Sequence, residues 1–172
     1  MPEDNTILME GVRITFRNLA GRETKFNAEG KRNFCVILPE EIVDDLQKDG
    51  WNVKFTKVRE EGDEPEAYLK VNVKYGRSRP PKVVLITSRG RTELPEQFVH
   101  LVDMVDIKEV DLIVRPYKWD VSGNSGITAY LKTMFIKVNE DYLELKYAEI
   151  EEADHRDIIE AEVIEDRLAI ER

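Results

Sequence analysis

Tyrosine and lysine side chains recur together in two stretches of the sequence, a combination that suits binding to a flat and negatively charged ligand. Tyr68 and Lys70 occupy alternate positions in the stretch AYLKVNVKY, and Tyr130 and Lys132 do so in ITAYLKTMFIKV. Aromatic rings stack on nucleic-acid bases of any sequence, and cationic side chains pair with the phosphates. The two stretches together predict a surface for single-stranded nucleic acid. Either stretch alone would also suit an exposed strand that binds nothing, because tyrosine favours β-strands.

The first of these stretches predicts a strand with one apolar face and one open face. Successive side chains of a strand point to opposite faces. Leu69 and Val71, with their odd-numbered neighbours, would face a core. Tyr68, Lys70 and Lys74 would face solvent, which places one aromatic ring among ammonium groups.

The second stretch is one arm of a predicted hairpin, RPYKWDVSGNSGITAYLK. A five-residue turn, SGNSG, would set Val121 opposite Ile127. A slip of one residue would exchange the two faces of the hairpin, because the side-chain period of a strand is two. The predicted register gives an exposed trio, Lys118, Tyr130 and Lys132, and turns two rings, Tyr117 and Trp119, towards the core or its rim.

Positive charge is concentrated in one segment of a chain whose net charge is −9. Residues 139–172 carry 13 acidic and 4 basic side chains, which leaves residues 1–138 neutral, and residues 67–91 contain seven basic side chains and no acidic one. Such a run can be an ordinary solvated face, but a local positive field also steers a polyanion towards the protein. The predicted nucleic-acid-binding residues are Lys54, Tyr68, Lys70, Lys74, Arg77, Arg79, Lys82, Arg89, Arg91, Lys118, Tyr130 and Lys132.

Residues arranged for catalysis are scarce in this sequence. It contains no phosphate-binding glycine loop, no nucleophile-elbow serine and no paired histidines. Two histidines and the single Cys35 are too few and too scattered for a zinc site. We therefore expect no enzymatic activity, no metal and no cofactor. The one set of acids that could hold magnesium for a nuclease is Asp103, Asp106, Glu109 and Asp111.

Short alternating runs separated by turn signals predict a mostly β fold. Seven strands and two helices are expected, and so few helices could not cover both faces of a parallel sheet. The pattern favours an antiparallel barrel or sandwich. The predicted strands span residues 11–18, 31–38, 51–58, 67–75, 82–88, 110–119 and 127–138, and the predicted helices span 39–50 and 94–102.

The two ends of the chain carry separate signals. The N-terminus lacks the basic and then apolar run of a signal peptide, and no apolar stretch is long enough to span a bilayer, so a soluble cytoplasmic protein is expected. Residues 139–172 have helical spacing at first and then become an acidic tail. Such a tail could occupy a basic groove, recruit partner proteins or simply add solubility.

Several ordered stretches resemble a family of bacteriophage single-stranded DNA-binding proteins. The resemblance covers roughly residues 8–149. It is carried by RNLAGRETKFNAEGKRNFCVIL, DGWNVKF, YLKVNVKY, PPKVVLITSRGRTEL, VDLIVRPYKWDVSGNSGITAYLKTMFIKV and ELKYAE. The resemblance implies an antiparallel oligonucleotide/oligosaccharide-binding (OB) barrel that protects single-stranded DNA during phage replication or recombination, in the cytoplasm of the infected bacterial cell.

The leading interpretation is a sequence-tolerant single-stranded DNA-binding protein. Residues 1–138 would form the OB-like binding domain, and residues 139–172 would form an acidic helix and tail that could recruit replication or recombination proteins. One alternative is a protein-interaction or inhibitor module whose acidic tail mimics nucleic acid. A second is a metal-dependent nuclease. The sequence leaves the choice of DNA or RNA, the site size and the oligomeric state open.

Overall fold

The structure is a computed structural model that describes residues 5–58, 60–141, 143 and 146. The chain divides into two units, Met1–Asn139 and Glu140–Arg172. Nearly all of the predicted acidic helix and tail lies outside the described residues. The separate roles predicted for residues 1–138 and 139–172 therefore stay predictions.

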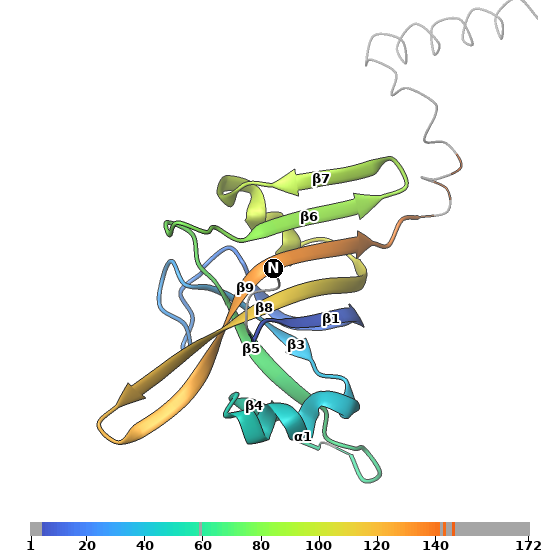
Figure 1. Cartoon of the computed structure of the whole chain (residues 1–172). Helices are drawn as coiled ribbons and strands as arrows, with labels where there is room; N and C mark the ends of the chain where they lie inside the picture. The colour runs from blue at the N-terminus through green and yellow to red at the C-terminus, as the bar shows by residue number, and fades with distance from the viewer. Residues whose placement is uncertain (1–4, 59, 142, 144–145, 147–172) are drawn as a thin grey trace, which may run out of the picture. The chain divides into compact units, whose positions relative to one another are not determined.

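The described residues form nine strands and two helical segments, so the prediction of a mostly β fold with two short helices is confirmed (Figure 1). The strands are β1 (Ile7–Val12), β2 (Ile14–Asn18), β3 (Arg32–Ile37), β4 (Val53–Phe55), β5 (Ala67–Val73), β6 (Lys82–Thr87), β7 (Gly90–Leu94), β8 (Ile107–Val121) and β9 (Asn124–Val138). The helical segments are the α-helix α1 (Glu40–Asp49) and the 3₁₀ helix η1 (Glu96–Asp103).

The strands form one OB-like sheet that does not close into a barrel. Its main order is β1-β8-β9-β5-β3-β2, with β4 paired to β5 and the β6–β7 hairpin paired to β9. All pairs are antiparallel except those of β9 with β5 and with β6. The long strand β9 can serve three neighbours because it pairs with β5 through its first half and with β6 through its second. Lys132 lies at an irregularity between these halves, where the pairing with β8 shifts by one residue.

One face of the sheet carries the hydrophobic core. Along β5, the side chains of Ala67, Leu69, Val71 and Val73 are buried and those between them are not, as the alternation predicted. The strands β8 and β9 bury alternate residues on the same side, β3 adds Phe34 and Val36, and η1 adds two valines. The other face of β5 is thereby left open and carries the predicted binding residues.

The helix α1 follows the local signals in its sequence. Two glutamates in its first turn favour the positive end of the helix dipole. Gly50 ends the helix in the left-handed conformation, with φ at 98°, and its N–H donates to the carbonyls of Leu46 and Gln47. The next residue, Trp51, is buried and forms an isolated bridge to Ile127 of β9. The end of α1 is therefore attached beside the β8–β9 hairpin.

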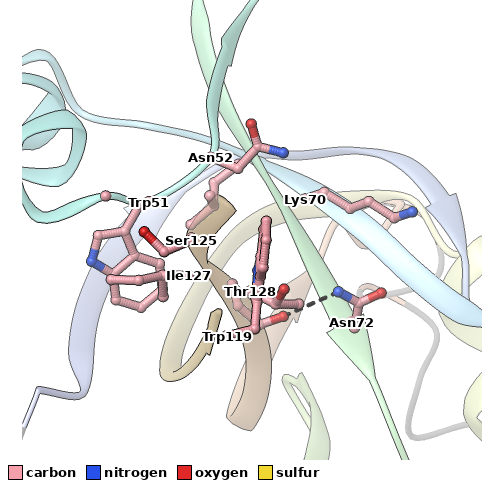
Figure 2. Close-up of a pocket in the computed structure, with 12 residues that line it drawn as sticks. Trp51, Asn52, Lys70, Asn72, Trp119, Ser125, Ile127 and Thr128 are labelled. Carbon is pink, nitrogen blue, oxygen red and sulfur yellow. Dashed lines mark hydrogen bonds between the residues drawn. The ribbon is translucent and has the colours of Figure 1, made fainter. Parts of the chain in front are cut away.

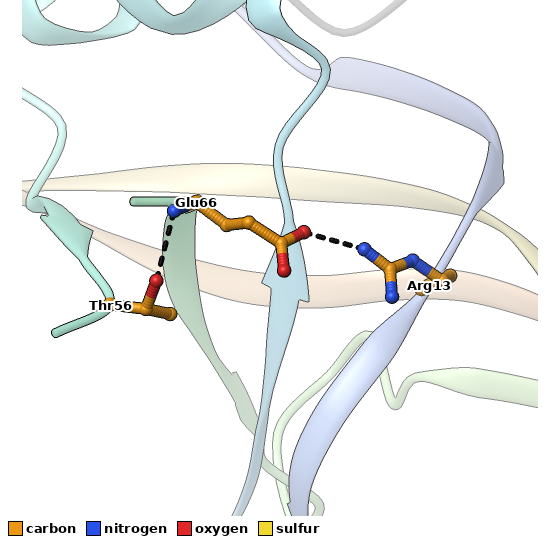
Figure 3. A network of polar contacts seen from close by, with 3 residues as sticks. All are labelled: Arg13, Thr56 and Glu66. Carbon is orange, nitrogen blue, oxygen red and sulfur yellow. Dashed lines mark hydrogen bonds and ion pairs between the residues drawn. The ribbon is translucent and has the colours of Figure 1, made fainter. Parts of the chain in front are cut away.

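A polar network joins the start of β2 to the chain segments around β4 and β5 (Figure 3). The guanidinium of Arg13 donates to the carboxylate of Glu66 at 2.5 Å, and the backbone N–H of Glu66 donates to the Thr56 hydroxyl at 2.9 Å. Both charged side chains are largely exposed. Exposed ion pairs contribute only about 0–1 kcal/mol to stability, so this network mainly orients the segments that it joins.

The register predicted for the β8–β9 hairpin is wrong. Val121 pairs with Asn124 and Lys118 pairs with Ile127, so the turn is two residues long. The two turn residues, Ser122 and Gly123, have φ of 52° and 82°. Two central residues with positive φ make a tight turn whose twist matches that of the strands, which explains why the short turn wins over a five-residue loop.

This register exchanges the two faces of β8 relative to the prediction. Trp119 pairs with Gly126 and Tyr117 with Thr128, so both rings lie on the same face as Tyr130. Lys118 lies on the opposite face. Tyr117 and Trp119 therefore belong to the open face and not to the core.

Two further differences concern strands at the edges of the sheet. The alternation within the predicted strand 51–58 places Phe55 on the same face as the buried Trp51, but Phe55 is 50% exposed because β4 is only three residues long and ends there. The strand β7, with four of its five side chains exposed, was not predicted. Its sequence, GRTEL, lacks the apolar alternation that identifies a strand.

Candidate nucleic-acid interface

The open face is centred on β5, where Tyr68, Lys70 and Asn72 point away from the core. Pairing places Lys54 of β4 opposite Tyr68, and Tyr130 of β9 opposite Asn72. Lys54 and Lys70 are exposed, and among the described residues neither of them forms an ion pair. Both predicted tyrosines and two predicted lysines thus lie on one surface, which we call the open face.

Tyr130 is the centre of an aromatic and cationic cluster on this surface. The Tyr117 ring meets it edge to face, with centroids 6.0 Å apart and an interplanar angle of 88°. The guanidinium carbon of Arg77 lies 5.3 Å from the Tyr130 centroid. A cation over a ring is attracted by the ring's quadrupole, which holds Arg77 next to the aromatic surface. Tyr117 remains 51% exposed and available to a ligand.

Trp119 extends the aromatic surface along the hairpin. Its indole lies directly over Gly126 on β9, where an added Cβ would be only 2.6 Å from Cζ2 of the indole. The missing side chain at Gly126 allows the ring to lie close against the neighbouring strand. The hairpin runs beyond the rest of the sheet as a two-stranded ribbon (Figure 1), and Trp119 belongs to its β8 arm.

A pocket of about 480 Å³ lies between this hairpin and β5. Trp51, Lys70, Asn72, Trp119 and Thr128 contribute to its walls (Figure 2). The amide of Asn72 donates to the carbonyl of Ala129 at 3.4 Å, which links β5 to β9 beneath the pocket. The pocket therefore combines an aromatic wall with an exposed ammonium group.

A second pocket, of about 380 Å³, has Asn72 and Tyr130 in its walls. Its walls include Arg32, Lys74 and Tyr75, and Glu96 lies 3.9 Å from the Arg32 guanidinium. Burial raises the pKa of Tyr75, so its hydroxyl stays protonated at neutral pH. Neither Nε of Arg32 nor the Tyr75 hydroxyl has a hydrogen-bond partner among the described residues. Both atoms are buried in the walls of this pocket, and no sequence signal pointed to Arg32 because it lies outside the acid-free segment.

The single cysteine lies on β3 beside the open face. Cys35 pairs with Lys70 and is buried. Burial raises the pKa of the Cys35 thiol, and the positive charges of Lys70 and Lys54 offset only part of this effect. The thiol is therefore neutral at pH 7 and adds no negative charge to the surface.

Several predicted site residues lie apart from the open face. Arg89 lies at the turn of the β6–β7 hairpin and Arg91 at the start of β7. The ammonium of Lys82 lies 6.0 Å from the Phe135 ring, on the half of β9 that pairs with β6. Lys118 faces the other side of the hairpin. The basic segment of residues 67–91, which is continuous in sequence, is thus divided in space between two regions of the sheet.

Arg79 and Lys132 are the remaining predicted site residues. Arg79 is exposed in the turn that follows β5. Lys132 lies at the irregular position of β9.

The four acids considered for a nuclease bind separate partners. Asp103 accepts the backbone N–H groups of Leu19 and Ala20, and Asp111 accepts that of Gly11. Glu109 pairs with Lys137, and Asp106 accepts from the side chain of Asn139. In the part of the chain that the structure describes, no group of three or more His, Cys, Asp or Glu residues could hold a metal ion. Each of these four carboxylates therefore has a partner within the fold, which gives it a structural role.

Residues 2–169 of the chain match the sequence model of a family described as "Putative phage ssDNA-binding domain". The match includes all but a few residues at the two ends of the chain. The chain belongs to this family of phage single-stranded DNA-binding domains. The resemblance found in the sequence is confirmed.

Solved structures with the same fold as this phage domain include the single-stranded DNA-binding protein from bacteriophage Enc34. Its complex with ssDNA has a TM-score of 0.54 and 14% identity, over 81% of this chain and 89% of the other. A C-terminally truncated form has a TM-score of 0.53 and 15% identity, over 81% and 88%. At sequence identities this low, the structural matches establish a shared fold alone. Among curated proteins, none matches the chain.

One further property of the phage domain concerns membranes. Within the described residues, no helix combines the length and the apolar character that crossing a bilayer requires.

Proposed function

We propose that this protein binds single-stranded DNA on its open face, without sequence preference and without catalysis. The observation that carries the proposal is the grouping of four rings with two cations on one surface. The rings are Tyr68, Tyr117, Trp119 and Tyr130, and the cations are Lys70 and Arg77. Family membership supports the same conclusion, as does the shared fold with a phage protein solved in complex with ssDNA.

Base stacking would supply much of the affinity. Each stacked base contributes about 1–3 kcal/mol, and every base offers a π face, so stacking requires no particular sequence. Tyr117 and Trp119 are 51% and 38% exposed, which leaves much of each ring available. Lys54, Lys70 and Arg77 would contact the phosphates that lie between stacked bases.

The biological role that we propose is protection of single strands during phage DNA replication or recombination, in the cytoplasm of the infected cell. In this role, the acidic segment 139–172 would compete for the open face or recruit replication and recombination proteins. Its 13 acids against 4 bases support either use. A strongly anionic segment is attracted to the same cations that bind phosphate.

Titration of a fluorescently labelled oligonucleotide with and without magnesium tests the proposal. Binding without cleavage, and weaker binding by Tyr68→Ala and Tyr130→Ala, would support it. The matched control is Phe98→Ala, because Phe98 is 51% exposed on η1 and is not part of the open face. An absence of binding would favour a protein-interaction module, and shortening of the oligonucleotide would favour a nuclease. Tyrosine variants that remain folded and bind normally would show that the open face is not the binding surface.

A further inference from the structure

Two phenylalanine rings with no structural role in the core lie beyond the edge of the open face. Phe16 on β2 is 67% exposed, and Phe26, in the loop that joins β2 to β3, is 90% exposed. The Phe16 ring lies 6.0 Å from that of Tyr68, so this group begins where the open face ends. Large exposed apolar side chains that gather in one place often mark an interaction site.

Phe16 has a backbone conformation that is unfavourable for its residue type. Its φ is 49°, in the left-handed region, which costs a residue other than glycine about 1–3 kcal/mol. The pairing of β2 with β3 shifts between Thr15 and Asn18, and Phe16 lies inside this irregularity. The irregular backbone holds an exposed ring in place without any gain from burial, and such strain is concentrated at functional sites.

Phe26 is presented by a loop with many internal hydrogen bonds. The amide of Asn27 donates to the carbonyls of Arg22 and Lys31, and its Oδ1 accepts from the amide of Asn33 on β3. The N–H of Gly30 donates to the carbonyl of Gly21 at 2.8 Å, which closes the base of the loop. A ring held by a fixed loop loses little conformational freedom when a ligand binds, so its stacking energy is available for affinity.

The charges around these two rings are mainly positive. A pocket of about 1010 Å³ in front of them is lined by Arg22, Lys54 and Lys70, among other residues. The ammonium of Lys25 lies 6.0 Å from the Phe26 ring. Asp103 also lines the pocket, but its two carboxylate oxygens accept the backbone N–H groups of Leu19 and Ala20, directly after β2. An anionic ligand with flat apolar parts therefore suits this pocket better than a neutral apolar peptide.

We propose that Phe16 and Phe26 form a second base-stacking site, the loop subsite, for the same DNA strand that the open face binds. This inference rests on the proposed function. The two regions are continuous, because Tyr68 and Lys70 belong to the open face and also line the pocket of the loop subsite. The strand crosses the sheet from the β8–β9 hairpin, over β5, to the loop that joins β2 and β3.

The sheet sets the length of DNA that can reach both regions. Four strand intervals separate β8 from β2 in the order β8-β9-β5-β3-β2. At about 4.8 Å for each interval, the distance is about 19 Å. This corresponds to about six nucleotides at about 3.4 Å each when the bases are stacked, and to fewer when the strand is extended. An oligonucleotide of about three nucleotides should therefore occupy the open face without reaching the loop subsite.

Fluorescence anisotropy on the full chain with labelled oligodeoxythymidylates of two lengths tests the loop subsite. Phe26→Ala should weaken binding of a long oligonucleotide, about twelve nucleotides, by at least about fivefold, which is the lower limit for one stacked base. Binding of a three-nucleotide oligonucleotide should change by less than about twofold, because it remains on the open face. Phe26→Ala should also keep the wild-type melting temperature, since its side chain is 90% exposed.

Phe98→Ala provides the matched control, and it should bind both lengths like the wild type. Normal binding of the long oligonucleotide by the double variant Phe16→Ala/Phe26→Ala would overturn the loop subsite and leave the open face intact. It would assign the two rings to another partner, such as a protein. Equal losses for both lengths would also overturn it, because the two regions would not then be separate. Failure of the wild type to bind either length would instead reject the proposed function itself.

Discussion

The contact between Trp119 and Gly126 gives the sharpest test of how the hairpin binds DNA. Replacing Trp119 with alanine removes one stacking ring, which should cost about 1–3 kcal/mol of binding free energy. Every 1.4 kcal/mol changes the dissociation constant about tenfold, so the expected loss is about 5- to 150-fold. Trp119 lies on the exposed ribbon outside the core, so the fold should lose little stability.

Gly126→Ala should disturb the same ring without removing it. The new Cβ would lie 2.6 Å from Cζ2 of the indole, against 3.4 Å for an ordinary contact, so the ring has to move by about 0.8 Å or more. The backbone of Gly126 does not have positive φ and accepts alanine. Gly126→Ala should therefore weaken binding by no more than the loss of the ring itself. In the Trp119→Ala background, the same substitution should have almost no effect.

A double-mutant cycle checks this expectation. Binding is measured as the fluorescence anisotropy of a labelled oligonucleotide titrated with unlabelled protein. Contacting residues show non-additive free energies, whereas independent residues add within about 0.3–0.5 kcal/mol. Strict additivity of Trp119→Ala and Gly126→Ala would refute the assigned contact. Normal affinity of Trp119→Ala, together with normal affinity of the Phe98→Ala control, would remove the hairpin from the binding surface.

Three further predictions concern salt, the core and the C-terminal segment. The logarithm of affinity should fall with the logarithm of salt concentration by about 0.7 for each phosphate contacted, and a flat response in a salt titration would contradict the electrostatic contribution. Phe34→Ala should lower the free energy of unfolding by about 3–5 kcal/mol because Phe34 is fully buried, while Phe55→Ala should change it by less than about 1 kcal/mol in urea denaturation. Deleting residues 151–172 removes nine acids and three bases, raises the net charge from −9 to −3, and should tighten binding at low salt. The gain should shrink as salt rises, because the screening length is only about 10 Å at 0.1 M. Equal affinity with and without the segment would reject competition for the open face.

Local signals accounted for the secondary structure where residues carry strong conformational preferences. The alternation along β5 predicted the buried and open faces correctly, because one side of that strand is uniformly apolar and the other side is mostly polar. The α-helix was predicted from its first-turn acids and its final glycine, and Gly50 does end it in the left-handed conformation. The strand β7 was missed because an edge strand with four exposed side chains has no apolar period to detect.

The binding face was only partly predictable. Tyr68 and Tyr130 could be assigned by the parity of their own strands, and pairing places them on one surface. Tyr117 and Trp119 were assigned wrongly because the turn length was wrong, and the error exchanged the faces of one strand relative to the other. The adjacent residues Ser122 and Gly123 were a usable signal for a two-residue turn that the five-residue interpretation overlooked.

The sequence by itself determined the family, the mostly β class, the alternation of the central strand and the unequal distribution of charge. These properties depend on residue type and on neighbours a few positions apart. Only the tertiary structure decided which residues share a surface, because that depends on register and on strand order. It separated Arg89 and Arg91 from the open face, although they lie in the same basic segment as Lys70. It also added Phe16 and Phe26 to the edge of that face, since a bulge and a loop closed by its own hydrogen bonds set the positions of both rings.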